Sequence, residues 1–287
     1  MNELHIDPPS NELLQKEQDL LSKLASYGSV AVAFSGGVDS TYLCAVAFEA
    51  LGDNALAVTA VSPALSQAEK EDARALSALL GIRHEIVTIS DELNSVFAQN
   101  PPDRCYHCKR AIMSKLIDCA HAHCCTTVIE ASNSDDGSDY RPGMRAVKEL
   151  GIKSPLAELA FTKNEIRALS KRRDLPTWNK PSLACLASRV PYGSPITQQK
   201  LRMIENAENL LRARGFPLVR VRHHGDVARI ELPPEDMARL LQPQTAQAVY
   251  EAMRALGFTY TALDLIGLRS GSMNEALSPD QKSNSTI

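Results

Sequence analysis

Short apolar runs alternate with amphipathic stretches along the first part of the chain. The stretch 10–27 carries leucines at helical spacing, which predicts an amphipathic helix. The predicted strands that follow are 29–34, 55–61, 84–89 and 126–131, and the predicted helices between them are 40–51, 66–80 and 108–122. A regular exchange of strand and helix predicts a parallel sheet with right-handed crossovers and helices on both faces.

The pattern changes near residue 190. A helix at 162–173, with Thr162 and Glu165 in capping-box positions, is the last of the first pattern. Beyond it we expect two helices, a hairpin with period-two alternation and a final strand. Their ranges are 197–214 and 234–255 for the helices, 219–222 with 227–232 for the hairpin, and 258–265 for the strand. We therefore predict an α/β fold with a doubly wound parallel sheet over residues 1–190, followed by a smaller α+β domain over 191–287.

Composition excludes several classes of protein. The 287 residues are 44% hydrophobic and 23% charged, which fits neither a disordered chain nor a collagen or a coiled coil. No apolar run approaches the ~20 residues that a membrane-spanning helix needs. Lys and Arg number 31 against 34 Asp and Glu, and this net charge of −3 argues against a grip on long nucleic acid. The first residues show no secretory signal, so we expect a cytoplasmic protein.

A glycine-bearing loop, Ser35-Gly36-Gly37-Val38-Asp39-Ser40, lies between the first sheet strand and the next helix. Ligands of doubly wound sheets bind at the carboxyl ends of strands, and glycines let a backbone approach an oxyanion. Amide groups at the start of the helix then bind phosphate, and Asp39 beside it suggests Mg²⁺. No Gly-Lys-Ser/Thr follows, so this is not a Walker loop. The alternative is an ordinary turn between a strand and a helix.

The cysteine spacing suggests a metal centre. Cys105 and Cys108 form a Cys-x-x-Cys pair just before a predicted helix, and Cys185 lies far along the chain. Three thiolates with no evident fourth favour a 4Fe–4S cluster with one iron free of protein, which could carry an extra sulfide. Zinc with His107 as a fourth ligand and thiols without any metal are the alternatives.

The other cysteines carry a weaker signal. Cys119, Cys124 and Cys125 lie at the end of a predicted helix and the start of a strand, where we expect them to be small apolar groups. A metal site that also uses His121 and His123 has no spacing rule in its support.

The loop Ser35–Ser40 resembles the PP-loop of the ATP pyrophosphatase superfamily, which has the fold of the adenine nucleotide alpha hydrolases. Those enzymes cleave ATP between the α- and β-phosphates and adenylylate an oxygen of the substrate. Further segments resemble the LarE family, and with the loop they cover most of residues 29–275. These segments are 104–109 (RCYHCK), 135–143 (DDGSDYRPG), 180–193 and 263–275.

The resemblance implies a reaction. LarE enzymes build the nickel-pincer nucleotide by adenylylating a carboxylate of pyridinium-3,5-biscarboxylic acid mononucleotide and converting it to a thiocarboxylate. Some members sacrifice the sulfur of one cysteine, and others use three cysteines and a 4Fe–4S cluster. The chain resembles the second kind through Cys105, Cys108 and Cys185. The sacrificial position corresponds to Cys185 or to its neighbour Ala184, and the second alignment would close the sacrificial route.

Several polar residues suit the anionic substrate of such an enzyme. Ser188 and Arg189 stand beside Cys185, and Arg220 and Arg222 share one face of a predicted strand, where guanidinium forks suit phosphate. Glu208 on the preceding helix would orient one of these arginines. A solvated strand face and a plain surface carboxylate are the alternatives.

An acidic loop follows the fourth predicted strand. Asp135, Asp136 and Asp139 there suit either a nucleotide or metal contact or a local cluster of turn and cap residues.

Other activities fit parts of the pattern. A PP-loop tRNA thiolase would share the cysteines but should be basic, an ammonia-using ligase needs no cysteine trio, and a non-enzymatic nucleotide-binding module needs few of these motifs. From the family resemblance we expect a homo-oligomer that takes a nucleotide substrate and a sulfide or other sulfur donor.

Overall fold

The computed structural model describes residues 8–61, 67–89, 94–138, 142–181, 185–269 and 271–278. The chain forms two compact units. The first comprises Met1–Leu93 and Cys105–Leu183, and the second comprises Asn94–Arg104 and Ala184–Ser285. The sequence analysis placed a boundary at residue 190. By their contacts, the segments 94–104 and 184–190 belong with the second unit.

The first unit has a parallel sheet of four strands in the order β3-β2-β1-β4. The strands are β1 (Val30–Ala33), β2 (Ala55–Val61), β3 (Arg83–Thr88) and β4 (Thr127–Ile129). The helices are α1 (Asn11–Ser26), α2 (Val38–Leu51), α3 (Gln67–Leu80), α5 (Arg104–Ala122), α6 (Gly143–Glu149), α7 (Pro155–Glu158) and α8 (Lys163–Arg172). β1 lies between β2 and β4, so β2 and β3 are added on one side of it and β4 on the other. That is the switch point at which sheets of this kind bind ligands.

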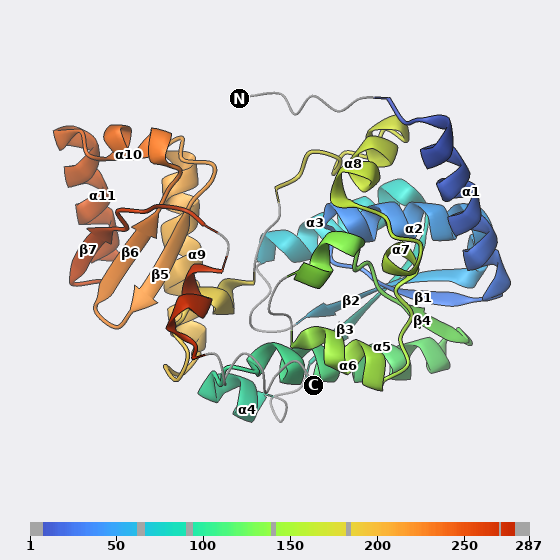
Figure 1. The fold of residues 1–287 in the computed structure, drawn as a ribbon. Coiled ribbons are helices and arrows are strands. Elements are labelled where there is room, and N and C mark those ends of the chain that lie inside the picture. Colours follow the sequence, from blue (N-terminus) through green and yellow to red (C-terminus); the bar gives the residue numbers. More distant parts are fainter. Residues whose placement is uncertain are drawn as a thin grey trace. The chain divides into compact units, whose positions relative to one another are not determined.

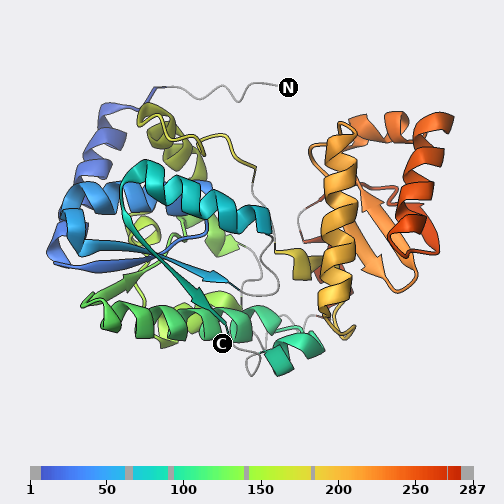
Figure 2. The same cartoon turned by 180° about the vertical axis from the view of Figure 1, so that it is seen from behind.

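Helices cover both faces of this sheet, as Figures 1 and 2 show from opposite sides. Val30 and Val32 of β1 pack against α1, α2 and α8, whereas Ala31 between them packs with residues of α5 and α6 on the other face. The alternation follows from the pleat of the strand. The predicted α/β fold with a doubly wound parallel sheet is therefore confirmed.

The second unit contains a three-stranded mixed sheet in the order β5-β6-β7. Its strands are β5 (Arg220–His224), β6 (Val227–Glu231) and β7 (Tyr260–Leu263), and its helices are α4 (Asn94–Gln99), α9 (Gln198–Ala213), α10 (Pro234–Leu240) and α11 (Pro243–Ala255). The antiparallel hairpin β5–β6 is the predicted one, and β7 runs parallel to β6. α9 and α11 bury apolar side chains such as Leu211 and Met253 against the sheet.

Two predicted helices have different bounds. The single helix expected over 234–255 is wrong, because α10 ends at Leu240 and a new helix, α11, begins at Pro243. A helix tolerates proline in its first turn but not in its interior. The Cys-x-x-Cys pair was expected just before a helix that starts at residue 108. Instead α5 begins at Arg104, so both cysteines are inside its first turns.

The helix after the sheet has the predicted start. Thr162 accepts a hydrogen bond from the Glu165 amide, and the Glu165 carboxylate accepts one from the Thr162 amide, which completes the capping box of α8. Among the described residues, no helix is long and apolar enough to span a membrane.

Candidate functional site

The glycine-bearing loop lies at the carboxyl end of β1 and leads directly into α2. Gly36 has φ of +69°, a conformation that side chains disfavour, and Gly37 is the N-cap of α2. In the described part of the chain, no side-chain hydrogen bond caps that helix. The Ser35 and Ser40 hydroxyls lie 3.0 Å apart, and the Gly37 amide donates to Ser35 Oγ at 3.4 Å. The serines thus close the loop on itself, and the amides at the start of α2 can receive an anion.

Asp39, the second residue of α2, has two different carboxylate oxygens. Oδ2 accepts a hydrogen bond from Lys163 Nζ, at the start of α8. Oδ1 is buried and has no hydrogen-bond partner among the described residues. A buried oxygen of this kind is costly unless a ligand satisfies it, and carboxylates are preferred ligands of Mg²⁺. The loop therefore fits the predicted Mg²⁺ and nucleotide.

A second lysine reaches the loop backbone. Lys180 Nζ donates to the Gly36 carbonyl at 3.2 Å and pairs with Asp72 at 2.7 Å. The guanidinium of Arg167, a buried residue of α8, donates to the carbonyls of Trp178 and Lys180 at 2.7 and 2.9 Å. Arg167 thereby holds the turn that carries Lys180. The sequence analysis missed Lys163 and Arg167 and gave Lys180 no role, because lone basic residues outside a motif carry no signal.

A network of polar side chains from β2, α3 and β3 holds the residue that precedes the loop. Thr59 of β2 donates to the carbonyl of Phe34, which precedes the loop, at 2.9 Å. His84 of β3 contacts the Thr59 hydroxyl at 2.8 Å and the Ser77 hydroxyl at 2.9 Å through its two ring nitrogens. Burial lowers the pKa of His84, and nearby Arg74 adds to that effect. Burial of the ring therefore favours its neutral form.

Cys105 and Cys108 lie in the first turns of α5. The spacing i, i+3 places them on one face of the helix, with Cys105 exposed and Cys108 partly exposed. Tyr106 between them is buried, and its hydroxyl donates to Glu149 at 2.6 Å. Tyr106 therefore anchors this turn of α5 while Cys105 remains accessible.

The same helix is tied to the carboxyl edge of the sheet. Lys109 pairs at 3.1 Å with Glu130, a buried residue directly after β4. Glu130 also accepts hydrogen bonds from the Ser132 and Ser154 hydroxyls at 2.9 and 2.6 Å. Burial raises the pKa of Glu130, but the Lys109 charge and these hydrogen bonds outweigh it and hold that pKa below its usual value.

Cys185, Ser188 and Arg189 belong to one short segment of the second unit. The Arg189 side chain is 3% exposed and donates to Glu208 at 2.8 and 3.2 Å. It also donates to the Cys185 carbonyl at 3.2 Å and to Ser188 Oγ at 3.0 Å. Arg189 thus binds the segment that carries Cys185 to α9.

Glu208 was expected to orient one of the two arginines of β5, but its hydrogen-bond partners are other groups. It is buried and accepts from Arg189, from Arg212 at 2.7 Å and from the Val221 amide at 3.1 Å. The alternative of a surface carboxylate is wrong as well, because only 1% of the side chain is exposed.

Arg222 and Arg220 of β5 differ in their partners. Arg222 is buried and donates to both oxygens of Glu231, to Ser272 Oγ and to the Ser188 carbonyl. A solvated strand face is therefore wrong for Arg222. Arg220 is partly exposed and donates to the Arg269 carbonyl at 3.0 Å, with no carboxylate partner among the described residues. Burial and the charges of Arg222 and Arg189 lower the pKa of Arg220. An added anion would relieve that repulsion.

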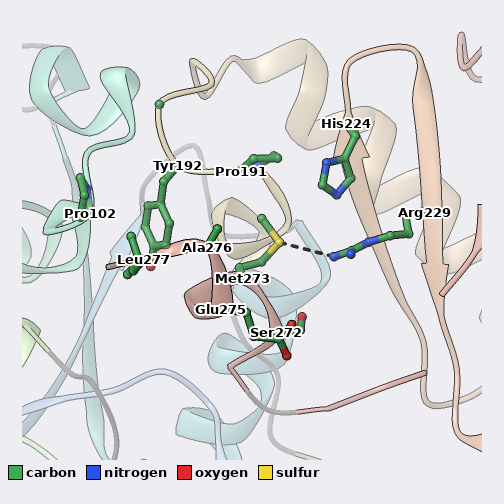
Figure 3. A pocket seen from close by; sticks show the side chains of 11 residues that line it. Pro102, Pro191, Tyr192, His224, Arg229, Ser272, Met273, Glu275, Ala276 and Leu277 are labelled. Carbon is green, nitrogen blue, oxygen red and sulfur yellow. Dashed lines mark hydrogen bonds between the residues drawn. The ribbon is translucent and has the colours of Figure 1, made fainter. Parts of the chain in front are cut away.

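A cavity of about 480 Å³ lies within the second unit (Figure 3). Tyr192, His224, Arg229 and Met273 are among its lining residues, and none of the site residues predicted from the sequence lines it. Arg229 pairs with Asp264 at 3.3 Å and contacts the Met273 sulfur at 3.8 Å, which Figure 3 marks. The volume is in the range of small-molecule sites.

The carboxylates of the acidic loop after β4 accept hydrogen bonds from backbone amides, one within the loop and one 28 residues away at the start of α8. Asp135 accepts from the Lys163 amide at 2.8 Å, and Asp136 accepts from the Asn133 amide at 3.1 Å. These contacts fit the cap and turn interpretation. Asp139 lies outside the described residues.

Three further cysteines lie at or just after the other end of α5. Cys125 is buried and Cys119 packs on the same apolar cluster, while Cys124 is exposed. Burial raises the pKa of the Cys119 and Cys125 thiols. The described ranges contain no group of three or more His, Cys, Asp or Glu placed to bind a metal ion. The described side chains of Cys119, Cys124, Cys125, His121 and His123 therefore form no such group.

Known proteins are similar to this chain, two of them over more than nine tenths of its length. The family model of NAD synthase matches residues 12–112. The pyridinium-3,5-bisthiocarboxylic acid mononucleotide synthase of Lactiplantibacillus plantarum is 38% identical over 270 residues, which cover 94% of this chain and 97% of that protein. An uncharacterised protein of Synechocystis sp. is 43% identical over 265 residues, covering 92% of this chain and 99% of that one. The NH₃-dependent NAD⁺ synthetase of Chlorobaculum tepidum is 37% identical over 76 residues, covering 26% of this chain and 27% of that enzyme.

The family model of NAD synthase matches a range that includes the loop Ser35–Ser40, so this loop is a PP-loop. The match to the Lactiplantibacillus plantarum synthase covers 94% of this chain at 38% identity, which shows that the two proteins belong to one family. This chain belongs to the LarE family of pyridinium-3,5-bisthiocarboxylic acid mononucleotide synthases.

Proposed function

We propose that this protein is an ATP-dependent sulfurtransferase that converts a carboxylate of pyridinium-3,5-biscarboxylic acid mononucleotide to a thiocarboxylate. The observation that carries the proposal is the PP-loop, with an uncapped helix start and an unsatisfied Asp39 oxygen. It occurs in a chain that aligns end to end with a synthase of the bisthiocarboxylic acid product. A cytoplasmic location and a homo-oligomer remain predictions from the sequence.

The first step is adenylylation. An oxygen of the substrate carboxylate attacks the α-phosphorus of ATP, and pyrophosphate leaves. Mg²⁺ would neutralise charge on the phosphates, with Asp39 as its ligand from this chain. Amides at the start of α2 bind phosphate oxygens, and Lys180 beside the Gly36 carbonyl adds positive charge there. The carboxylate thereby gains AMP as a leaving group.

The second unit supplies a basis for binding the mononucleotide. Arg220 is the arginine of β5 that has no carboxylate partner among the described residues, so we assign it to the substrate phosphate. Arg222 and Arg189 serve it indirectly, because their charges favour an anion near Arg220 while Glu231 and Glu208 fix their positions. The cavity of about 480 Å³ in the same unit is in the volume range of small-molecule sites.

The second step delivers sulfur. A sulfide nucleophile attacks the acyl carbon, and AMP leaves with the electrons of the bond that breaks. We propose Cys105, Cys108 and Cys185 as three thiolate ligands of a 4Fe–4S cluster. The accessible Cys105 thiol and the shared helix face of Cys105 and Cys108 fit such ligands. When bound, the cluster would supply an iron without a protein ligand, to which extra sulfide can attach.

The test is a reaction with purified protein, ATP, Mg²⁺, sulfide and the biscarboxylic mononucleotide under anaerobic conditions. We expect AMP, pyrophosphate and a product in which sulfur replaces a carboxylate oxygen, detected by mass spectrometry. Asp39→Asn should abolish AMP formation, and Asp53→Asn, an exposed change away from the PP-loop, should not. ATP cleavage to ADP, or AMP release with no need for the mononucleotide, would overturn the proposal.

A further inference from the structure

We propose that Lys163 is a resident counter-ion of the PP-loop. It neutralises Asp39 in the nucleotide-free protein and transfers to the phosphates when nucleotide and Mg²⁺ bind together. This inference rests on the proposed binding of ATP at the same loop. It assigns a role to a residue outside the PP-loop motif, and it predicts that the metal and the nucleotide bind cooperatively.

The pairing of Lys163 with Asp39 is specific to one oxygen. Lys163 Nζ donates to Oδ2, while Oδ1 is buried without a partner among the described residues. The two side chains are 27% and 21% exposed, so their attraction is stronger than that of a surface pair. An ammonium on Oδ2 therefore already neutralises the charge of the carboxylate whose free Oδ1 would bind a divalent cation.

The backbone of Lys163 is fixed more firmly than its side chain. Its amide donates to Asp135 Oδ2 at 2.8 Å, and the capping box of Thr162 and Glu165 closes the same turn of α8. Glu165 is itself paired with Lys16 at 2.8 Å. The flexible stem of Lys163 is thus the part that can move, and it swings from a fixed point at the start of α8.

The charges set the direction of the exchange. Without nucleotide, a divalent cation at Oδ1 is repelled by the ammonium on Oδ2, and an ammonium that moved away would leave its carboxylate partner. With nucleotide present, the phosphate oxygens receive Lys163 while Asp39 receives the cation, so both charges remain paired. Mg²⁺ typically binds through one or two carboxylates together with substrate phosphates, which agrees with this order.

Lys180 provides a matched comparison, because it is also a lysine at the PP-loop. It contacts the Gly36 carbonyl at 3.2 Å and Asp72 at 2.7 Å, and no described contact joins it to Asp39. A lysine that only adds positive charge to the phosphate site should affect nucleotide binding alone. A resident counter-ion should affect metal and nucleotide binding in opposite directions.

The experiment is calorimetric titration of the full chain with Mg²⁺ alone and with a non-hydrolysable ATP analogue plus Mg²⁺. For Lys163→Met we expect Mg²⁺ alone to bind about tenfold more tightly and the analogue about tenfold more weakly, the scale of one lost charge contact. For Lys180→Met we expect weaker analogue binding with unchanged Mg²⁺ affinity. Lys163→Arg should restore weak Mg²⁺ binding, since it restores the charge.

Unchanged Mg²⁺ affinity in Lys163→Met, or a parallel loss of both affinities, overturns the inference while nucleotide binding to the wild type keeps the proposed function intact. If the analogue does not bind the wild type, the proposed function itself fails. Lys163→Gln replaces the methionine variant if circular dichroism shows that the latter is misfolded, and the same two outcomes decide.

Discussion

Arg189 and Glu208 form a bidentate ion pair, with nitrogen–oxygen distances of 2.8 and 3.2 Å and side chains that are 3% and 1% exposed. The same guanidinium donates to the Cys185 carbonyl at 3.2 Å. Arg189 was expected to act at the site directly. Its contacts instead make it the residue that holds the Cys185 segment on α9, so the position of a proposed sulfur ligand depends on a buried carboxylate.

The first prediction concerns this pair. Glu208→Gln keeps the shape of the side chain but leaves the buried Arg189 charge without its counter-ion. We expect a loss of roughly 3 kcal/mol in the free energy of unfolding, as is typical when one partner of a buried pair is removed. Urea unfolding measures it. Glu205→Gln on the same helix, where the carboxylate is partly exposed, is the control and should be near neutral. Equal stability of the two variants would refute the structural role of Glu208.

The second prediction separates Arg220 from Arg222. Arg220→Met removes a partly exposed cation whose pKa burial and its charged neighbours already lower, so it should leave stability unchanged or higher. The variant should bind the biscarboxylic mononucleotide at least about tenfold more weakly, because a charged contact to phosphate is lost.

The comparison variant is Arg222→Met, which leaves Glu231 buried with less of its counter-charge. This variant should unfold at a lower urea concentration. Titration calorimetry and urea unfolding together measure both effects. A stability loss for Arg220→Met as large as that for Arg222→Met would contradict the assignment of Arg220 to substrate.

A third prediction uses the backbone of the PP-loop. Gly36 and Gly151 have nearly the same φ, +69° and +68°, and lie far apart in sequence. A Cβ added at either residue would make no contact shorter than ordinary van der Waals distance. Either change to alanine should cost about 1–2 kcal/mol of stability from left-handed strain. Gly36→Ala alone should also weaken binding of an ATP analogue, which calorimetry detects. Loss of binding in Gly151→Ala would indicate a general effect on folding instead.

The fourth prediction is a pH dependence. Burial lowers the pKa of His84, so the folded state binds this proton less readily than the unfolded chain. The resulting stability is fully present above the ordinary histidine value of about 6.5 and is lost as pH falls through the lower folded value. His84→Gln should make the fall of the unfolding temperature between about pH 8 and pH 5 less steep.

His223 and His224 of the second unit have lowered pKa values too, so some slope should remain in that variant. His121→Gln, which changes an exposed side chain at the end of α5, is the matched control and should retain the slope of the wild type. An identical slope for His84→Gln and the wild type would show that burial does not hold the His84 ring in its neutral form.

The sequence predicted those features that depend on local patterns. Apolar runs located the parallel strands, and the Gly36–Gly37 pair located the loop at the carboxyl end of β1, because both signals are contained in a few neighbouring residues. The capping box of Thr162 and Glu165 was found in the same way. Pro243 was an available signal for the break between α10 and α11 that the helical period concealed.

Long-range pairings were not predictable in this way. Lys163 reaches Asp39 and Arg222 reaches Ser272 only after the chain has folded, and neither spacing has a periodic signature. The sequence placed Glu208 on the correct helix but not beside its partner. A buried carboxylate needs a cation, and Arg189 is a cation that is buried together with it.

Iron and acid-labile sulfide in the anaerobically purified protein test the proposed sulfur route most directly. The account predicts about four irons and four sulfides per chain in the wild type, and their loss in Cys105→Ala and Cys185→Ala. Cys124→Ala, which removes an exposed cysteine outside the trio, should keep them. A wild type without iron, or equal iron in all four proteins, would contradict a cluster held by Cys105, Cys108 and Cys185.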